Sequence, residues 1–159
     1  MYKQELPLLF PDDKDLKNVK KATYDPFEFM YELYKSKKLN TNFKKSLGNI
    51  SYHVPCHLMV QNIGFKTKEI LQLIPDTNIN VVERCSGHDG TWGIKKEYYD
   101  MSMKIGKPVF NRMSSNNPDY ISSDCAIAGI HIKQGISDEK KINVKKLHPI
   151  SLLRLSYQI

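Results

Sequence analysis

The spacing of apolar residues changes between strand-like and helix-like patterns along the chain from residue 49 onward. Short apolar runs bounded by turn residues predict strands, and apolar residues three or four positions apart predict helices that bury one side. The predicted strands are residues 50–54, 79–82 and 120–122. The predicted helices are residues 63–74, 91–105, 108–113, 125–134 and 150–157. This alternation predicts an α/β fold with a mostly parallel sheet built from βαβ units and with helices on both faces.

The amino-terminal part of the chain has a different pattern. Residues 1–22 combine prolines with a charged run and are predicted to be an irregular arm. A helix is predicted to start at Pro26, because Asp25 can cap it and Glu28 completes a capping box. We therefore expect residues 1–48 to be an amino-terminal arm and helix, packed either on the following domain or against an upstream one. Residues 49–159 are expected to be the α/β domain.

Composition and charge narrow the class of protein. A chain of 159 residues with 40% hydrophobic and 26% charged residues is typical of one soluble domain and argues against long disorder. No apolar run reaches the roughly 18–20 residues that a membrane span needs, and none behind Met1 resembles a secretory signal, so a cytoplasmic location is expected. The net charge of +7 lies in the flanks, as scattered lysine pairs. No nucleic-acid partner is expected from such a distribution.

The three cysteines, Cys56, Cys85 and Cys125, each come directly after a predicted strand. The carboxyl ends of parallel strands share one edge of the sheet, and ligands bind there, so we expect the three thiols to converge. A helix that begins near each thiol favours the thiolate, the form that binds metals. Asp124, just before Cys125, fits a helix N-cap. The cysteines alone therefore predict a metal site, and the alternative is that they are packed as small hydrophobic residues.

A glycine-rich segment follows Cys85 and contains further candidate residues. Gly87 and Gly90 would let the backbone approach a bound group closely, which makes them candidate cofactor-binding residues. His88 could complete a Cys₃His set, which is an accepted structural zinc site. His53 and His57 flank Cys56 and are rival fourth ligands, with His53 ranked below His88 because it lies within the predicted strand. His131 and His148 have no cysteine beside them and are read as structural.

Four segments together resemble a known family, the cysteine-rich CCG domain that occurs in heterodisulfide reductase and in anaerobic glycerol-3-phosphate dehydrogenase. They are residues 52–57, 83–90, 123–129 and 148–153, and the similarity covers residues 49–159. The resemblance implies a component of an electron-transferring, iron–sulfur-linked oxidoreductase that needs partner chains. Those partners would be ferredoxin-like or flavoprotein subunits, and peripheral membrane association is compatible with the resemblance. The chain looks like the carboxyl-terminal domain of a larger protein of this kind.

The sequence departs from the full motif at two of its five cysteines, because Ser86 and Ala128 stand where the motif has thiols. Three thiols are too few for the two-part cluster that five would hold. They suffice for zinc in a Cys₃ or Cys₃His site, or for a [4Fe–4S] cluster with one ligand that is not cysteine. The residues leave iron–sulfur and zinc both open. The alternative function is a metal-free, non-enzymatic interaction module whose basic flanks dock an acidic partner or a membrane surface.

Overall fold

The computed structural model of the chain describes residues 1–88, 90 and 92–159. It divides into two compact units, Met1–Leu39 and Asn40–Ile159. None of the described helices is both long enough and apolar enough to cross a membrane.

The first unit consists of three short helices, α1 (Glu5–Leu9), α2 (Lys14–Ala22) and α3 (Pro26–Lys35). The prediction of an irregular arm over residues 1–22 is wrong, because α1 and α2 occupy most of it. The charged run supplies the cap of α2, since the carboxylate of Asp13 accepts the backbone N–H of Leu16 at 2.9 Å. Lysines in the last turn of α2 add a favourable interaction with the helix dipole.

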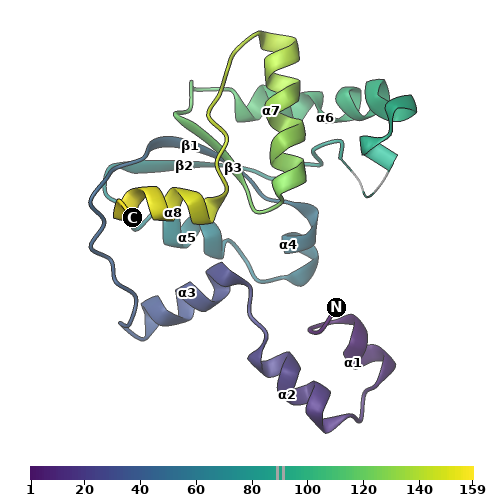
Figure 1. Cartoon of the computed structure of the whole chain (residues 1–159), viewed down its shortest axis with the longest axis vertical. Coiled ribbons are helices and arrows are strands. Elements are labelled where there is room, and N and C mark those ends of the chain that lie inside the picture. Colours follow the sequence, from purple (N-terminus) through teal and green to yellow (C-terminus); the bar gives the residue numbers. More distant parts are fainter. Residues whose placement is uncertain (89, 91) are drawn as a thin grey trace. The chain divides into compact units, whose positions relative to one another are not determined.

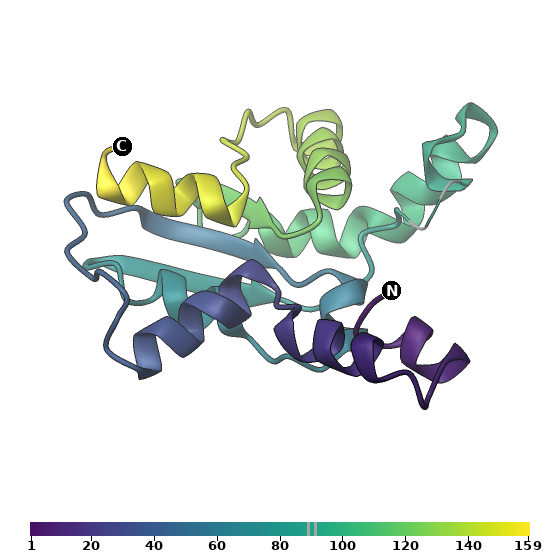
Figure 2. The ribbon, with the colours of Figure 1, turned by 60° about the horizontal axis from the view of Figure 1, so that its bottom comes forward.

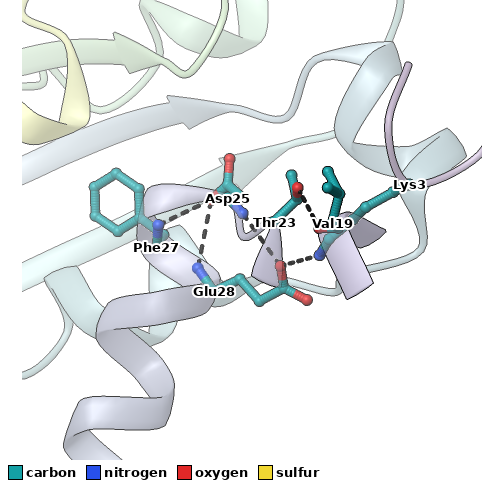
Figure 3. A network of polar contacts seen from close by, with 6 residues as sticks. All are labelled: Lys3, Val19, Thr23, Asp25, Phe27 and Glu28. Carbon is teal, nitrogen blue, oxygen red and sulfur yellow. Dashed lines mark hydrogen bonds and ion pairs between the residues drawn. The ribbon is translucent and has the colours of Figure 1, made fainter. Parts of the chain in front are cut away.

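The start of α3 is as the sequence predicts. The side chain of Asp25 accepts the backbone N–H groups of Phe27 and Glu28, and the Glu28 carboxylate accepts the N–H of Asp25 in return (Figure 3). The same carboxylate forms an ion pair with the ammonium group of Lys3. This capping box fixes the point at which α3 begins.

The second unit is built on a three-stranded sheet of β1 (Gly48–His53), β2 (Thr77–Val82) and β3 (Tyr120–Ser123). The strand order is β2-β1-β3, and both pairings are parallel, which confirms the predicted sheet. All three strands run in one direction and end at the same edge (Figure 2). Parallel pairing puts the three loops that carry the cysteines at this edge.

Helices cover both faces of the sheet, as predicted (Figure 1). Their bounds are α4 (Cys56–Gln61), α5 (Lys66–Leu71), α6 (Tyr99–Met113), α7 (Ala126–Lys140) and α8 (Pro149–Tyr157), with 3₁₀ turns η1 (Trp92–Ile94) and η2 (Lys96–Tyr98). Helices α6 and α7 pack on the face that presents His53, Val82 and Ile121, and α5 and α8 lie on the face that presents Tyr52. The core under α6 and α7 consists of buried apolar side chains: Val82, Val109, Phe110, Met113, Ile121, Ile132, Ile136 and Val144.

Three predicted helix boundaries are wrong. The helix expected over 63–74 starts only at Lys66, because Gly64 has a φ of +73° that a helix cannot contain, and a separate helix, α4, precedes it. The helices expected over 91–105 and 108–113 are one, since Pro108 lies inside α6; the expected start, Thr91, is outside the described residues. Helix α7 continues past Gly135, which packs inside the helix against the Phe110 ring.

Candidate functional site

The three cysteines lie at the carboxyl edge of the sheet, each on a different strand-to-helix connection. Cys56 is the first residue of α4, Cys85 follows β2, and Cys125 is the N-cap residue of α7. All three line one pocket of about 400 Å³. Cys56 and Cys85 are exposed and Cys125 is half-buried, so the pocket opens to solvent at its thiols. Parallel pairing thus brings together residues that are far apart in the chain.

His53, at the end of β1, joins the three connections. Its Nε2–H donates to the backbone carbonyl of Arg84 at 2.9 Å, and its Nδ1 accepts the hydroxyl of Ser123 at 3.0 Å. The same Ser123 hydroxyl oxygen accepts the backbone N–H of Cys125 at 3.3 Å. Burial lowers the pKa of His53, the hydrogen bond to Arg84 opposes this, and the nearby His57 lowers it further, so the net shift favours the neutral ring.

Because both nitrogens of His53 have protein partners, His53 holds the site together and does not serve as a metal ligand. Its ring lines the pocket from within β1, where the strand keeps it almost wholly buried. The other rival ligand, His57, lines the pocket from the first turn of α4 and is exposed.

The loop after β2 packs against α6 at Gly87. This residue has a φ of +82°, and a Cβ atom built on it would lie 2.1 Å from the backbone oxygen of Ser102. No other residue type fits there without moving the loop. The N–H of Gly87 points back to the sulfur of Cys85 at 3.5 Å. Gly87 therefore positions the loop, whereas Gly90 lines the pocket itself.

Cys125 is held at the amino terminus of α7, a helix of 15 residues. Its sulfur accepts the backbone N–H of Ala128 at 3.5 Å, so the thiol and not Asp124 caps the helix, contrary to expectation. The sulfur of Cys125 therefore lies at the helix amino terminus with a backbone N–H directed at it. The Asp124 carboxylate faces the other side of the sheet, where it accepts the hydroxyls of Tyr52 and Thr67.

His88 also lines the pocket, and its buried Nε2 atom has no hydrogen-bond partner among the described residues. The neighbouring imidazole of His131, on α7, has a ring centroid 6.4 Å away, and within the same part of the chain its buried Nε2 also lacks a partner. The sequence marked His131 as structural; the signal that could have singled it out is its place one helical turn after Ala128. The expectation that His148 is structural agrees with its cap of α8, where Nδ1 accepts the N–H of Ile150.

The described residues include no group of three or more His, Cys, Asp or Glu side chains arranged to hold a single metal ion. The donors that line the pocket nevertheless suit an iron–sulfur cluster. A cluster is a body of several atoms, so its ligating sulfurs lie farther apart than the ligands of one ion do. Backbone N–H groups directed at two of the sulfurs, and an unpartnered imidazole nitrogen, are the surroundings such a group requires.

The pattern that defines the CCG cysteine-rich domain matches residues 50–133, just over half of the chain. The chain belongs to the CCG cysteine-rich domain family. The pocket of this CCG domain is lined by Cys56, Cys85 and Cys125 and also by Ser86 and Ala128, the two residues that the resemblance aligns with further motif cysteines. These five positions share one pocket, and three of them carry a thiol.

Two curated relatives are, by name, single subunits of oxidoreductases. A subunit of the anaerobic glycerol-3-phosphate dehydrogenase of Escherichia coli (strain K12) is 33% identical over 105 residues, which is 65% of this chain and 25% of the relative. A subunit of the fumarate reductase (CoM/CoB) of Methanothermobacter marburgensis is 28% identical over 112 residues, which is 68% of this chain and 22% of the relative. The chain spans about a quarter of the length of these relatives. No solved structure matches it.

Proposed function

We propose that this CCG domain is an electron-transferring component of an iron–sulfur-linked oxidoreductase, and that its cysteine pocket is the site of the cluster. The observation that carries the proposal is the convergence of Cys56, Cys85 and Cys125 on one pocket of about 400 Å³. When bound, an iron–sulfur cluster accepts and releases electrons.

The residues of the pocket have distinct roles in this proposal. Cys56, Cys85 and Cys125 are the thiolate ligands, and His88 is the ligand that is not cysteine. The N–H groups of Gly87 and Ala128 donate to the sulfurs of Cys85 and Cys125. Gly90 keeps the pocket wall free of a side chain.

Iron–sulfur is preferred to zinc because of how the donors are arranged. Zinc in a structural site takes four ligands at about 2.0–2.3 Å around one point. The three thiols line a shared pocket, but no three donors among the described residues are gathered around one point in that way. An iron–sulfur cluster has several metal atoms, so its ligands need not be gathered around one point.

Other subunits are the proposed partners. The chain spans about a quarter of relatives that are themselves named as subunits, so we infer that electrons reach and leave this domain through ferredoxin-like or flavoprotein chains. The exposure of Cys56 and Cys85 supports this proposal, because a partner can approach the pocket from the solvent side. Which substrate the assembled protein oxidises or reduces is a property of those partners.

The test is anaerobic purification of the chain followed by its visible spectrum and analysis of iron, sulfide and zinc. We expect charge-transfer absorption with iron and acid-labile sulfide, and loss of most of both in Cys125→Ser. Ile127→Ser is the matched control, because Ile127 is two residues away on the same helix and exposed. A colourless zinc-loaded protein would contradict the iron–sulfur assignment. A metal-free protein whose stability is indifferent to chelators would favour the interaction module.

A further inference from the structure

The two outer edges of the sheet differ in whether backbone hydrogen bonds cover them. The strand order β2-β1-β3 makes β3 one outer strand and β2 the other. The β3 edge is covered, because the N–H of Ile121 donates to the carbonyl of Lys145 at 2.9 Å and its carbonyl accepts the N–H of Leu147 at 3.1 Å. Within the described part of the chain, β2 has backbone hydrogen bonds only with β1 and with Val54, which continues β1. An outer strand of this kind offers unpaired N–H and C=O groups to another strand.

The direction of one hydrogen bond identifies the residues of β2 whose backbone faces outward. The carbonyl of Val82 accepts the N–H of Val54 at 3.0 Å, so the backbone groups of Val82 face β1. Successive residues of a strand direct their backbone groups to opposite sides. Asn80 therefore also faces β1, whereas the N–H and C=O groups of Ile79 and Val81 face outward.

The sequence of β2 has none of the features that keep an outer strand from pairing. Soluble proteins protect such strands with lysine, proline, a bulge or an inward-pointing charge. The six residues Thr77–Val82 include no charged residue and no proline, although the chain has a net charge of +7. Their register with β1 is continuous, without a bulge. The outer side of β2 is therefore a regular, uncharged edge that is open to pairing.

Exposed charges at the two ends of β2 indicate which partner fits this edge. Asp76 lies directly before the strand and Arg84 lies just beyond its end, and neither has an ion pair with a described residue. Two identical β2 strands can lie antiparallel with Asn80 opposite Asn80. In that register, Asp76 of each copy is opposite Arg84 of the other. Ile79 is then opposite Val81, so their outward N–H and C=O groups form hydrogen-bonded pairs.

We propose that a second copy of the chain binds at β2, with the two β2 strands antiparallel around a two-fold axis at Asn80. The two sheets join in the order β3-β1-β2-β2-β1-β3. The backbone hydrogen bonds supply affinity, and the opposite charges at the ends fix the register. A self-complementary contact around a two-fold axis is closed, so it gives a dimer and not a fibre. The inference does not depend on the proposed function, because the paired segment ends before Cys85.

The first experiment uses the full wild-type chain from about 10 µM to about 1 mM, a range that covers weak to moderate affinities. Sedimentation should show a rise from the mass of one chain to that of two. Hydrogen exchange, read at single residues by mass spectrometry, should slow about tenfold at the N–H groups of Ile79 and Val81 over the same range. The N–H of Asn80, which faces β1, should be protected at every concentration and is the internal control.

Charge substitutions at the proposed axis test whether this strand forms the contact. Asn80→Lys and Asn80→Asp each place like charges opposite one another, so each should weaken dimerisation about tenfold or more. An equimolar mixture of the two variants places opposite charges there and should restore the dimer. Asn18→Lys and Asn18→Asp are the matched controls, because Asn18 is an exposed residue of α2 in the first unit. Neither control should change dimerisation.

A wild-type chain that stays monomeric at the highest concentration overturns the inference. A dimer also overturns it if both Asn80 variants leave it unchanged, if the mixed variants fail to restore it, or if Ile79 and Val81 exchange as fast as in the monomer. The exchange measurement needs no substitution, so it decides the inference even if a variant does not fold. All these results leave the proposed function intact, because bound iron and sulfide test that function separately.

Discussion

Two groups of buried polar side chains lie on opposite faces of the sheet near its carboxyl edge, and they differ in whether their hydrogen bonds are satisfied. On the face covered by α5 and α8, the hydroxyls of Tyr52 and Thr67 both donate to the Asp124 carboxylate. On the face covered by α6 and α7, the Nε2 atoms of His88 and His131 have no hydrogen-bond partner in the part of the chain that the structure describes. The group of Tyr52, Thr67 and Asp124 is hydrogen-bonded within itself, whereas the two imidazole nitrogens, like Ser122 Oγ on the other face, lack a protein partner among the described residues.

At this edge of the sheet, we assign the Asp124 group to stability and the cysteine pocket to function. A closed network contributes to folding and gains nothing from a ligand. The Nε2 atoms of His88 and His131 have no such hydrogen bond with the described residues to contribute. The cysteine pocket includes His88, and we place the functional centre there because the three thiols converge on it.

The largest change in stability is expected from breaking the hydrogen bonds between Asp124 and the hydroxyls of Tyr52 and Thr67. Asp124→Ala leaves the hydroxyls of Tyr52 and Thr67 buried without an acceptor, which should lower the free energy of unfolding by about 2–4 kcal/mol. Urea denaturation of the metal-free chain measures it. Asp138→Ala, at an exposed carboxylate, should stay within about 0.5 kcal/mol of the wild type. Equal, small effects of the two substitutions would mean that the network does not support the fold.

A smaller effect is expected where the Cys85 loop meets α6. Gly87→Ala puts a Cβ atom against the Ser102 backbone and should cost about 1–3 kcal/mol and displace the loop, with loss of bound iron. Gly64→Ala has a similar backbone strain at a φ of +73° but meets no atom within 4 Å and is not part of the pocket wall. It should therefore lose stability but keep its iron. If both variants keep iron equally, the loop does not depend on Gly87.

His53, whose two ring nitrogens both have hydrogen-bond partners, should make the stability of the chain depend on pH. Burial lowers its pKa below the ordinary value of 6.5 in the folded chain. The unfolded state therefore binds the proton more readily, so the stability that His53 contributes is present above pH 6.5 and is lost as the pH falls. As the pH falls from 7.5 to 5.5, this group should lower the free energy of unfolding of the metal-free chain by up to about 1.4 kcal/mol per pH unit.

His53→Gln should make that slope shallower without removing it, because the pKa of His131 is lowered as well. Glutamine keeps polar atoms near Ser123 and Arg84, so the comparison isolates titration from the loss of hydrogen bonds. A slope identical to that of the wild type would show that His53 does not titrate in this range.

The smallest change in stability is expected at His131. His131→Leu replaces an imidazole whose Nε2 has no partner among the described residues, and it also removes the hydrogen bond to the Ser102 backbone, so the metal-free chain should lose only about 1 kcal/mol of stability. A loss of stability as large as that of Asp124→Ala would instead assign His131 to the fold.

The sequence predicts the sheet and the meeting of the cysteines, because alternating strands and helices allow one parallel arrangement whose strand ends share an edge. It does not predict the helices before residue 23, since the cap by Asp13 is hidden in a run of charges and a proline. Pro108 and Gly135 led to wrong helix ends for a different reason. Tertiary packing under α6 and α7 outweighs their local preference to end a helix.

The sequence does not predict that the imidazoles of His88 and His131 are neighbours. His131 is 43 residues after His88 and belongs to a different element, so only the packing of α6, α7 and the Cys85 loop brings the rings together. The role of His53 is hidden in the same way, because hydrogen bonds to Arg84 and Ser123 decide that it is a structural residue.

Iron K-edge X-ray absorption of the anaerobically prepared chain tests most directly whether the cysteine pocket holds an iron–sulfur cluster. The account predicts a sulfur shell around iron together with a short iron–iron distance, and loss of both in the variant that lacks all three thiols. Iron surrounded by oxygen and nitrogen alone, or a sulfur-bound zinc ion in its place, would contradict it.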